Sequence, residues 1–114
     1  MKRTKDWLDQ AEGDLKAAKA LCDTGNYAWS CFASQQSAEK SLKATLDSLA
    51  IPTIGHNLLL LASTISEKIE VSDSVKSACK SGAPVHMYDK EDALQAIRDA
   101  EEALNFAKKA TGFT

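Results

Sequence analysis

The spacing of apolar residues is the feature that most constrains how this chain can fold. Near the start of the chain they recur at steps of four, four, three and four residues: Trp7, Ala11, Leu15, Ala18 and Cys22. A similar stripe appears near the end: Ala93, Ile97, Ala100, Leu104 and Ala107. These steps place each set on one side of an α-helix. No segment alternates with the strand period over more than a few residues. The sequence therefore predicts an all-α fold.

Helix-breaking and helix-capping residues divide the chain into five segments. Gly25-Asn26 ends the first helix by left-handed capping, and Pro52 prevents the second from continuing. Side chains suited to the N-cap stand at several helix starts: Thr4 or Asp6, Asn57, Ser72 or Asp73, and Asp89. The expected helices cover residues 4–25, 27–49, 58–69, 73–82 and 89–109. Short connections favour antiparallel neighbours, so we expect one domain over residues 1–114, an up-and-down bundle of four long helices plus one short helix.

Composition excludes several classes of protein. The net charge of −2 provides no general basic field, so nucleic acid would need a local patch. The basic N-terminus precedes no apolar run, and no segment approaches the roughly 20 apolar residues of a membrane span. Three cysteines form no CxxC pair, and the two histidines lie far apart. We therefore expect a cytoplasmic protein with reduced thiols, no metal and no cofactor.

An unusual polar cluster lies in the second predicted helix, within "FASQQSAEKSLKATL". Its members are Gln35, Gln36, Glu39, Lys40 and Lys43. The periodicity puts Gln35 in the core stripe of this helix, where an unpartnered amide costs on the order of 1–3 kcal/mol. Small neighbours such as Ser34, Ser37 and Ser41 indicate a packing centre. The cluster is therefore interpreted as a solvated face, a seam between subunits or a binding site.

The segment "QQSAEKSLKATL" resembles the Gln-Gln-x-x-Glu-Lys-x-x-Lys-Ala signature of the HEPN domain family. The likeness extends to four further segments in the family's order: "WLDQAEGDLKAAKAL", "GNYAWSCFASQQ", "GHNLLLL" and "YDKEDALQAIRDAEEAL". The resemblance implies a bundle of four or five helices that forms a homodimer. It also implies two kinds of function. Some members are ribonucleases, with an arginine followed four to six residues later by a histidine. Others are non-catalytic partners of a small nucleotidyltransferase in toxin–antitoxin pairs, or bind nucleotides.

The sequence departs from the ribonuclease pattern, because its only arginines, Arg3 and Arg98, have no histidine at that distance downstream. Lys80 precedes His86 by six residues and is the candidate substitute, although lysine lacks the planar two-point grip of arginine. The lead hypothesis is a homodimeric, non-catalytic HEPN-like binding module whose partner is a small nucleotidyltransferase, with nucleotide or RNA as a weaker possibility. The alternatives are a metal-independent ribonuclease that uses His86 or His56, and a bundle that serves only for assembly.

Several side chains carry the predicted site. Lys40 and Lys43 are the phosphate candidates, with Gln36 and Glu39 as hydrogen-bonding neighbours. His56 either fixes the loop after Pro52 or contacts a partner or nucleotide. The aromatic residues Trp7, Tyr27 and Trp29 are expected in the core or on a dimer surface rather than as platforms for stacked bases.

Overall fold

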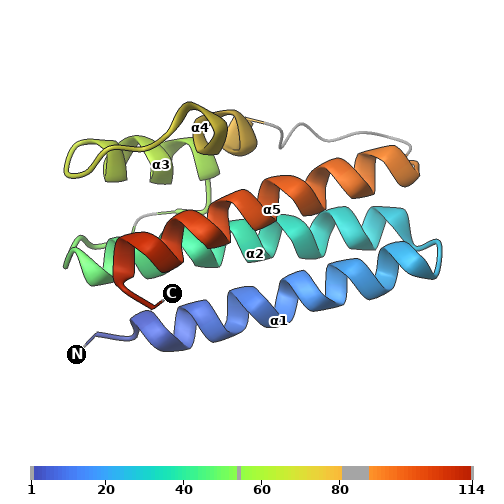
Figure 1. The fold of residues 1–114 in the computed structure, drawn as a ribbon, viewed down its shortest axis with the longest axis horizontal. Helices are drawn as coiled ribbons and strands as arrows, with labels where there is room; N and C mark the ends of the chain where they lie inside the picture. Colours follow the sequence, from blue (N-terminus) through green and yellow to red (C-terminus); the bar gives the residue numbers. More distant parts are fainter. Residues whose placement is uncertain (1, 54, 81–87, 114) are drawn as a thin grey trace.

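A computed structural model describes residues 2–53, 55–80 and 88–113. Five helices follow one another in this part of the chain: α1 (Thr4–Asp23), α2 (Tyr27–Ser48), α3 (Leu58–Ser66), α4 (Asp73–Lys80) and α5 (Lys90–Thr111). Helices α1, α2 and α5 lie side by side along the long axis, and the short helices α3 and α4 cover one side of them (Figure 1). Helix α5 runs in the same direction as α2 and antiparallel to α1 (Figure 1). The predicted all-α bundle is confirmed.

The third helix is shorter than predicted, so the bundle has three long helices and two short ones. Helix α3 has 9 residues and ends at Ser66, although residues 67–69 were also expected to be helical. Beyond it, the amide of Lys68 donates to the carbonyl of Ile65 at 2.9 Å, which tightens the chain into a turn. This turn places the half-buried Ile69 and the buried Val71 against the core. Burial of these side chains explains why the helix stops early.

The predicted caps are correct except at the first helix. The side chain of Asn57 accepts a hydrogen bond from the amide of Leu60 at 3.1 Å, and Asp89 forms a reciprocal capping box with Asp92. Gly25 has φ +81°, as left-handed capping requires. Thr4, however, is buried and does not cap α1, because it is already the first helical residue.

The buried face of α2 also differs from the prediction. Gln35 is exposed, so it does not belong to the core. The buried positions in the first half of α2 are serines, namely Ser30, Ser34 and Ser37, and Ser41 is buried further along the helix. Two of them donate to carbonyl oxygens of α1, Ser30 to Ala18 at 2.6 Å and Ser37 to Ala11 at 2.7 Å. Small side chains allow the backbones of α1 and α2 to approach closely, and this approach decides which side of α2 faces inward.

Two apolar clusters form the interior. The first joins α1, α2 and α5 and includes Leu8, Leu15, Ala44, Ile97 and Leu104. The second joins α2 to the short helices and includes Leu42, Leu46, Ile65, Val75 and Cys79. Helix α2 contributes to both clusters and is the central element of the fold. No helix in the described part of the chain has the length and apolar character needed to span a membrane.

Candidate functional site

Three side chains of the predicted site meet beside α2. The carboxylate oxygen Oε2 of Glu39 lies 3.1 Å from Lys43 Nζ and 3.1 Å from His56 Nδ1. Lys43 Nζ also lies 3.3 Å from His56 Nδ1. Since the lysine ammonium can only donate, Nδ1 either donates to Glu39 or accepts from Lys43. In the first arrangement the imidazole has a fixed tautomer and its Nε2 atom is free to accept a proton.

The Glu39–Lys43 pair is nearly enclosed by the protein. The side chains of Glu39 and Lys43 are each 11% exposed, which excludes the solvated-face interpretation for these two residues. They lie four residues apart on α2, where helical geometry makes them neighbours. The ring of Trp7 from α1 covers Lys43, with Nζ 5.4 Å from the ring centroid. His56, in contrast, is 78% exposed and covers the pair from the solvent side.

The second lysine of the predicted site is also paired. Lys40 Nζ lies 2.7 Å from the Oδ2 atom of Asp14 in α1, and both side chains are partly buried. Lys40 and Lys43 therefore each have a carboxylate partner within the same chain, Asp14 and Glu39 respectively. Each positive charge that the sequence offered for phosphate binding is already compensated.

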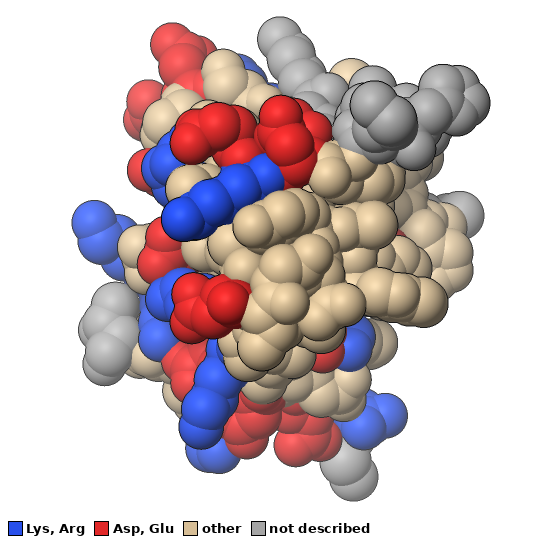
Figure 2. Space-filling view, turned by 90° about the vertical axis from the view of Figure 1, so that its right-hand side faces the viewer, with Lys and Arg blue, Asp and Glu red and all other residues tan. Residues whose placement is uncertain are grey.

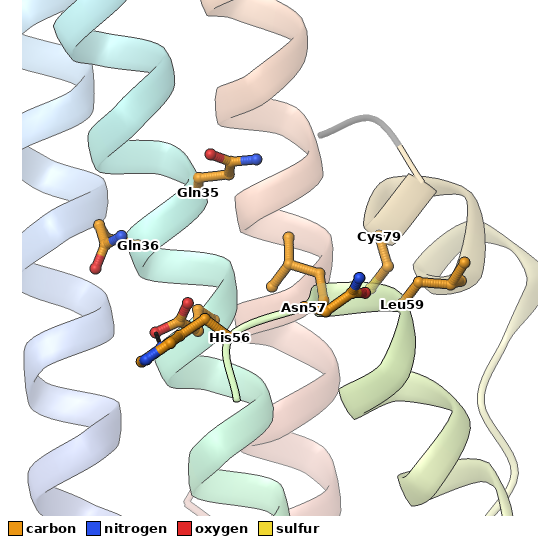
Figure 3. Close-up of a pocket in the computed structure, with 8 residues that line it drawn as sticks. Gln35, Gln36, His56, Asn57, Leu59 and Cys79 are labelled. Carbon is orange, nitrogen blue, oxygen red and sulfur yellow. Dashed lines mark hydrogen bonds and ion pairs between the residues drawn. The ribbon is translucent and has the colours of Figure 1, made fainter. Parts of the chain in front are cut away.

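A groove with a volume of about 490 Å³ lies next to this cluster. Its lining residues come from three segments: Gln35, Gln36 and Glu39 of α2, His56, Asn57, Leu58 and Leu59 around the start of α3, and Cys79 of α4. Gln35 and Gln36 leave α2 on opposite sides, and His56 reaches back to Glu39 (Figure 3). Four of the six predicted site residues thus line one groove, while Lys40 and Lys43 are not part of its lining.

The sequence did not identify the groove residues from α3 and α4. Leu58 and Leu59 belong to the apolar run "LLLL", which is typical of a core segment, yet Leu59 is 45% exposed. Cys79 is buried, and this burial raises the pKa of its thiol to about 11. Burial also raises the pKa of Cys31. Both thiols are therefore protonated near neutral pH, which makes them poor nucleophiles.

The weaker catalytic candidates cannot be placed in this site. His86 lies outside the described residues, and so does the side chain of Lys80. Within the described ranges, no group of three or more His, Cys, Asp and Glu side chains is arranged to hold a metal ion.

Comparison with known proteins supports the fold and the motif together. The model of the HEPN domain matches residues 4–110. The chain belongs to the HEPN domain family. The HEPN signature seen in the sequence therefore corresponds to the segment of α2 that carries Gln35, Gln36, Glu39, Lys40 and Lys43.

Individual relatives of this HEPN protein include one named as a toxin. "Putative toxin MJ1304" of Methanocaldococcus jannaschii is 27% identical over 133 residues, covering 95% of this chain and 88% of the relative. The crystal structure of TT1696 from Thermus thermophilus superposes with a TM-score of 0.87 at 29% identity, covering 96% of this chain and 99% of that one. The crystal structure of ST0689, an archaeal HEPN homologue, superposes with a TM-score of 0.81 at 30% identity, covering 96% of this chain and 98% of that one.

Proposed function

We propose that this HEPN protein is a non-catalytic binding module that acts as a homodimer and pairs with a small nucleotidyltransferase in a toxin–antitoxin couple. The observation that carries the proposal is the pairing of Lys40 with Asp14 and of Lys43 with Glu39. Cleavage of RNA develops negative charge on the phosphate, and this charge needs an available cation. The groove instead offers two glutamine amides, a carboxylate and leucine side chains, which suit the surface of a protein.

The positions of the arginines also support a non-catalytic role. Arg3 lies at the start of α1 and pairs with Asp6, while Arg98 on α5 donates to Gln95. Neither arginine lines the groove. Among the residues that the structure describes, the arginine and histidine pair of the family's ribonucleases thus has no counterpart at the groove. The named toxin relative supports a place in a toxin–antitoxin pair.

The direct test is co-purification. Small nucleotidyltransferases encoded in the same genome are co-expressed one by one with the tagged protein. We expect one of them to form a stable complex that Gln35→Arg and Gln36→Arg disrupt, because both substitutions place bulk and charge in the groove. Lys16→Glu on α1, an exposed position away from the groove, is the control and should leave the complex intact. If none of the candidates binds, the proposal is wrong.

A second candidate function, a metal-independent ribonuclease, is favoured by the contact between His56 and Glu39. A carboxylate 3.1 Å from Nδ1 can orient the imidazole of His56 as a general acid or base. The assay is RNA cleavage in EDTA by the purified protein and by His56→Ala, His86→Ala and Lys80→Ala. Cleavage that disappears in one variant would establish the enzyme and displace the non-catalytic proposal.

Nucleotide binding is the weaker part of the proposal. It would require Lys40 or Lys43 to exchange its carboxylate partner for a phosphate. Titration with ATP should show binding that Lys40→Ala and Lys43→Ala weaken. Unchanged binding in both variants would remove these lysines from any nucleotide site.

A further inference from the structure

The groove beside α2 is formed mainly by two stretches of the chain that carry no charge. Residues 24–38 contain no Asp, Glu, Lys or Arg, and neither do residues 48–66. Six of the eight residues that line the groove belong to these two stretches. Figure 2, which views the end of the molecule where α2 begins, shows many charged side chains on the left and a broad uncharged area beside them. A charged ligand would lose its hydration on such a surface without meeting an opposite charge.

The charge that does enter the groove is already compensated. Among the described lining residues, Glu39 is the only Asp, Glu, Lys or Arg. Its side chain is 11% exposed and its carboxylate lies 3.1 Å from the ammonium of Lys43, so a cationic ligand would have to displace that lysine. A phosphate or carboxylate would meet no Lys or Arg among the described lining residues. The lining therefore favours an uncharged ligand.

The groove offers hydrogen-bonding groups in place of charge. The side-chain amides of Gln35 and Gln36 form no hydrogen bond with any described residue (Figure 3). The side-chain oxygen of Asn57 accepts from the amide of Leu60, which leaves its NH2 group able to donate. A side-chain amide has an acceptor and a donor group, as a peptide unit does. It can therefore pair with the C=O and the N–H of a peptide backbone.

We propose that this groove binds an extended, uncharged peptide segment of the partner protein, and that Gln35 and Gln36 pair with its backbone. The inference rests on the proposed function and deepens it, because it names the part of the partner that enters the groove. An extended backbone has N–H and C=O groups that lose water on binding and need new partners. In a helix most of these groups are already bonded within the helix, so the glutamine amides would gain little from a helical segment.

An apolar wall in the groove provides a seat for a side chain of that segment. It consists of Leu58 and Leu59 at the start of α3 and Cys79 of α4, and Leu59 is 45% exposed. Gln35 leaves α2 on the same side as Leu59 and Cys79, so a backbone paired with Gln35 passes beside this wall (Figure 3). Successive side chains of an extended segment point to opposite sides, so one apolar side chain can contact the wall while its neighbours remain in solvent. The volume of about 490 Å³ lies within the usual range of ligand-binding clefts, about 300–1,000 Å³.

Selection from a phage-displayed library of random short peptides tests the class of ligand. We expect enriched peptides that contain an apolar residue and lack Asp, Glu, Lys and Arg around it. A synthetic peptide of the enriched sequence should bind about 5- to 10-fold more weakly to Gln35→Leu, which loses a hydrogen bond, and at least about tenfold more weakly to Leu59→Asp, which buries a charge. Gln95→Leu is the matched control, because Gln95 is exposed and does not line the groove. Failure to enrich any peptide, or enrichment of charged peptides, would overturn the inference.

Backbone methylation tests the pairing with an extended backbone. N-methylation of one peptide N–H at a time removes a donor and leaves every side chain of the peptide unchanged. At the position that pairs with Gln35, methylation should weaken binding to the wild-type protein about 5- to 10-fold and should have less effect on Gln35→Leu, because the two groups act as a pair. Equal losses in the two proteins at every position would rule out backbone pairing by Gln35.

Competition separates this inference from the proposed function. If a nucleotidyltransferase co-purifies with the protein, the selected peptide should displace it. A complex that the peptide leaves intact would refute the inference alone. A peptide that binds in the groove although none of the nucleotidyltransferases forms a complex would refute the proposed partner and would support the class of ligand inferred for the groove.

Discussion

The carboxylate of Asp47, one residue before the end of α2, accepts a hydrogen bond of 2.8 Å from the hydroxyl of Thr4, the first residue of α1. The same oxygen accepts the backbone amide of Arg3 at 2.7 Å. A helix N-terminus has unsatisfied amides and a partial positive charge, and the Asp47 carboxylate complements both. Helix α1 is thus capped by a residue more than 40 positions away in the sequence.

Replacement of Asp47 by alanine should therefore destabilise the protein. The loss of a side-chain cap typically costs about 1–2 kcal/mol. Urea denaturation followed by circular dichroism should show a lower midpoint at an unchanged m value. Asp9→Ala is the control, because Asp9 forms only an exposed ion pair with Lys5 and its loss should cost less than about 0.5 kcal/mol. Equal effects of the two variants would contradict the capping role.

Two serines of α2 should respond in opposite directions to the same substitution. Ser37 donates to the carbonyl of Ala11, so Ser37→Ala should cost about 0.5–1.5 kcal/mol. The buried hydroxyl of Ser34 has no hydrogen-bond partner among the described residues, so Ser34→Ala should be neutral or stabilising by up to about 1 kcal/mol. Thermal unfolding of the two variants side by side gives the comparison. Destabilisation by Ser34→Ala equal to that by Ser37→Ala would show that both hydroxyls are satisfied.

The Glu39–Lys43 pair should behave as a coupled unit. Lys43→Met leaves the enclosed carboxylate of Glu39 without its cation, and Glu39→Leu leaves the enclosed ammonium of Lys43 without its anion. Each substitution should lower the free energy of unfolding by about 3 kcal/mol. The double variant should cost less than the sum by at least about 1 kcal/mol, since no unpaired charge remains. Denaturant unfolding of all four proteins measures the coupling. Additive costs would show that the two charges do not stabilise one another.

Replacement of the exposed His56 should have little effect on stability. His56→Ala should change the free energy of unfolding by less than about 0.5 kcal/mol.

The thiol of Cys79 should react slowly in the folded protein. Burial raises its pKa from 9.0 to about 11, so at pH 8 the thiolate fraction falls about a hundredfold. The folded protein favours the neutral thiol more strongly than the unfolded chain does. The contribution of Cys79 to the free energy of unfolding is therefore fully present below pH 9 and is lost as the pH rises from 9 towards 11. Alkylation by iodoacetamide, mapped by mass spectrometry, should label Cys79 much faster in urea than in buffer. Equal rates in the two conditions would contradict the burial.

The local features of the fold were predictable because their causes lie within a few residues. Asn57 and Asp89 cap α3 and α5 through amides three positions away, and Gly25 ends the first helix by its own positive φ. The position of Gln35 was not predictable in this way. The prediction built the core stripe of α2 from apolar positions and did not count the serines, because a serine side chain is polar. Two of the serine hydroxyls, however, donate hydrogen bonds to carbonyls of α1 and can therefore be buried.

The sequence by itself determined the helical segments, most of their caps and the HEPN signature, since periodicity and capping are properties of nearby residues. The tertiary structure alone decided which side of α2 is buried, because that side depends on how closely α1 can approach. It also decided that Asp47 caps α1 and that Asp14 pairs with Lys40, contacts between different helices. The groove beside Glu39 and His56 exists only because α2, α3 and α4 come together, and no single stretch of sequence contains it.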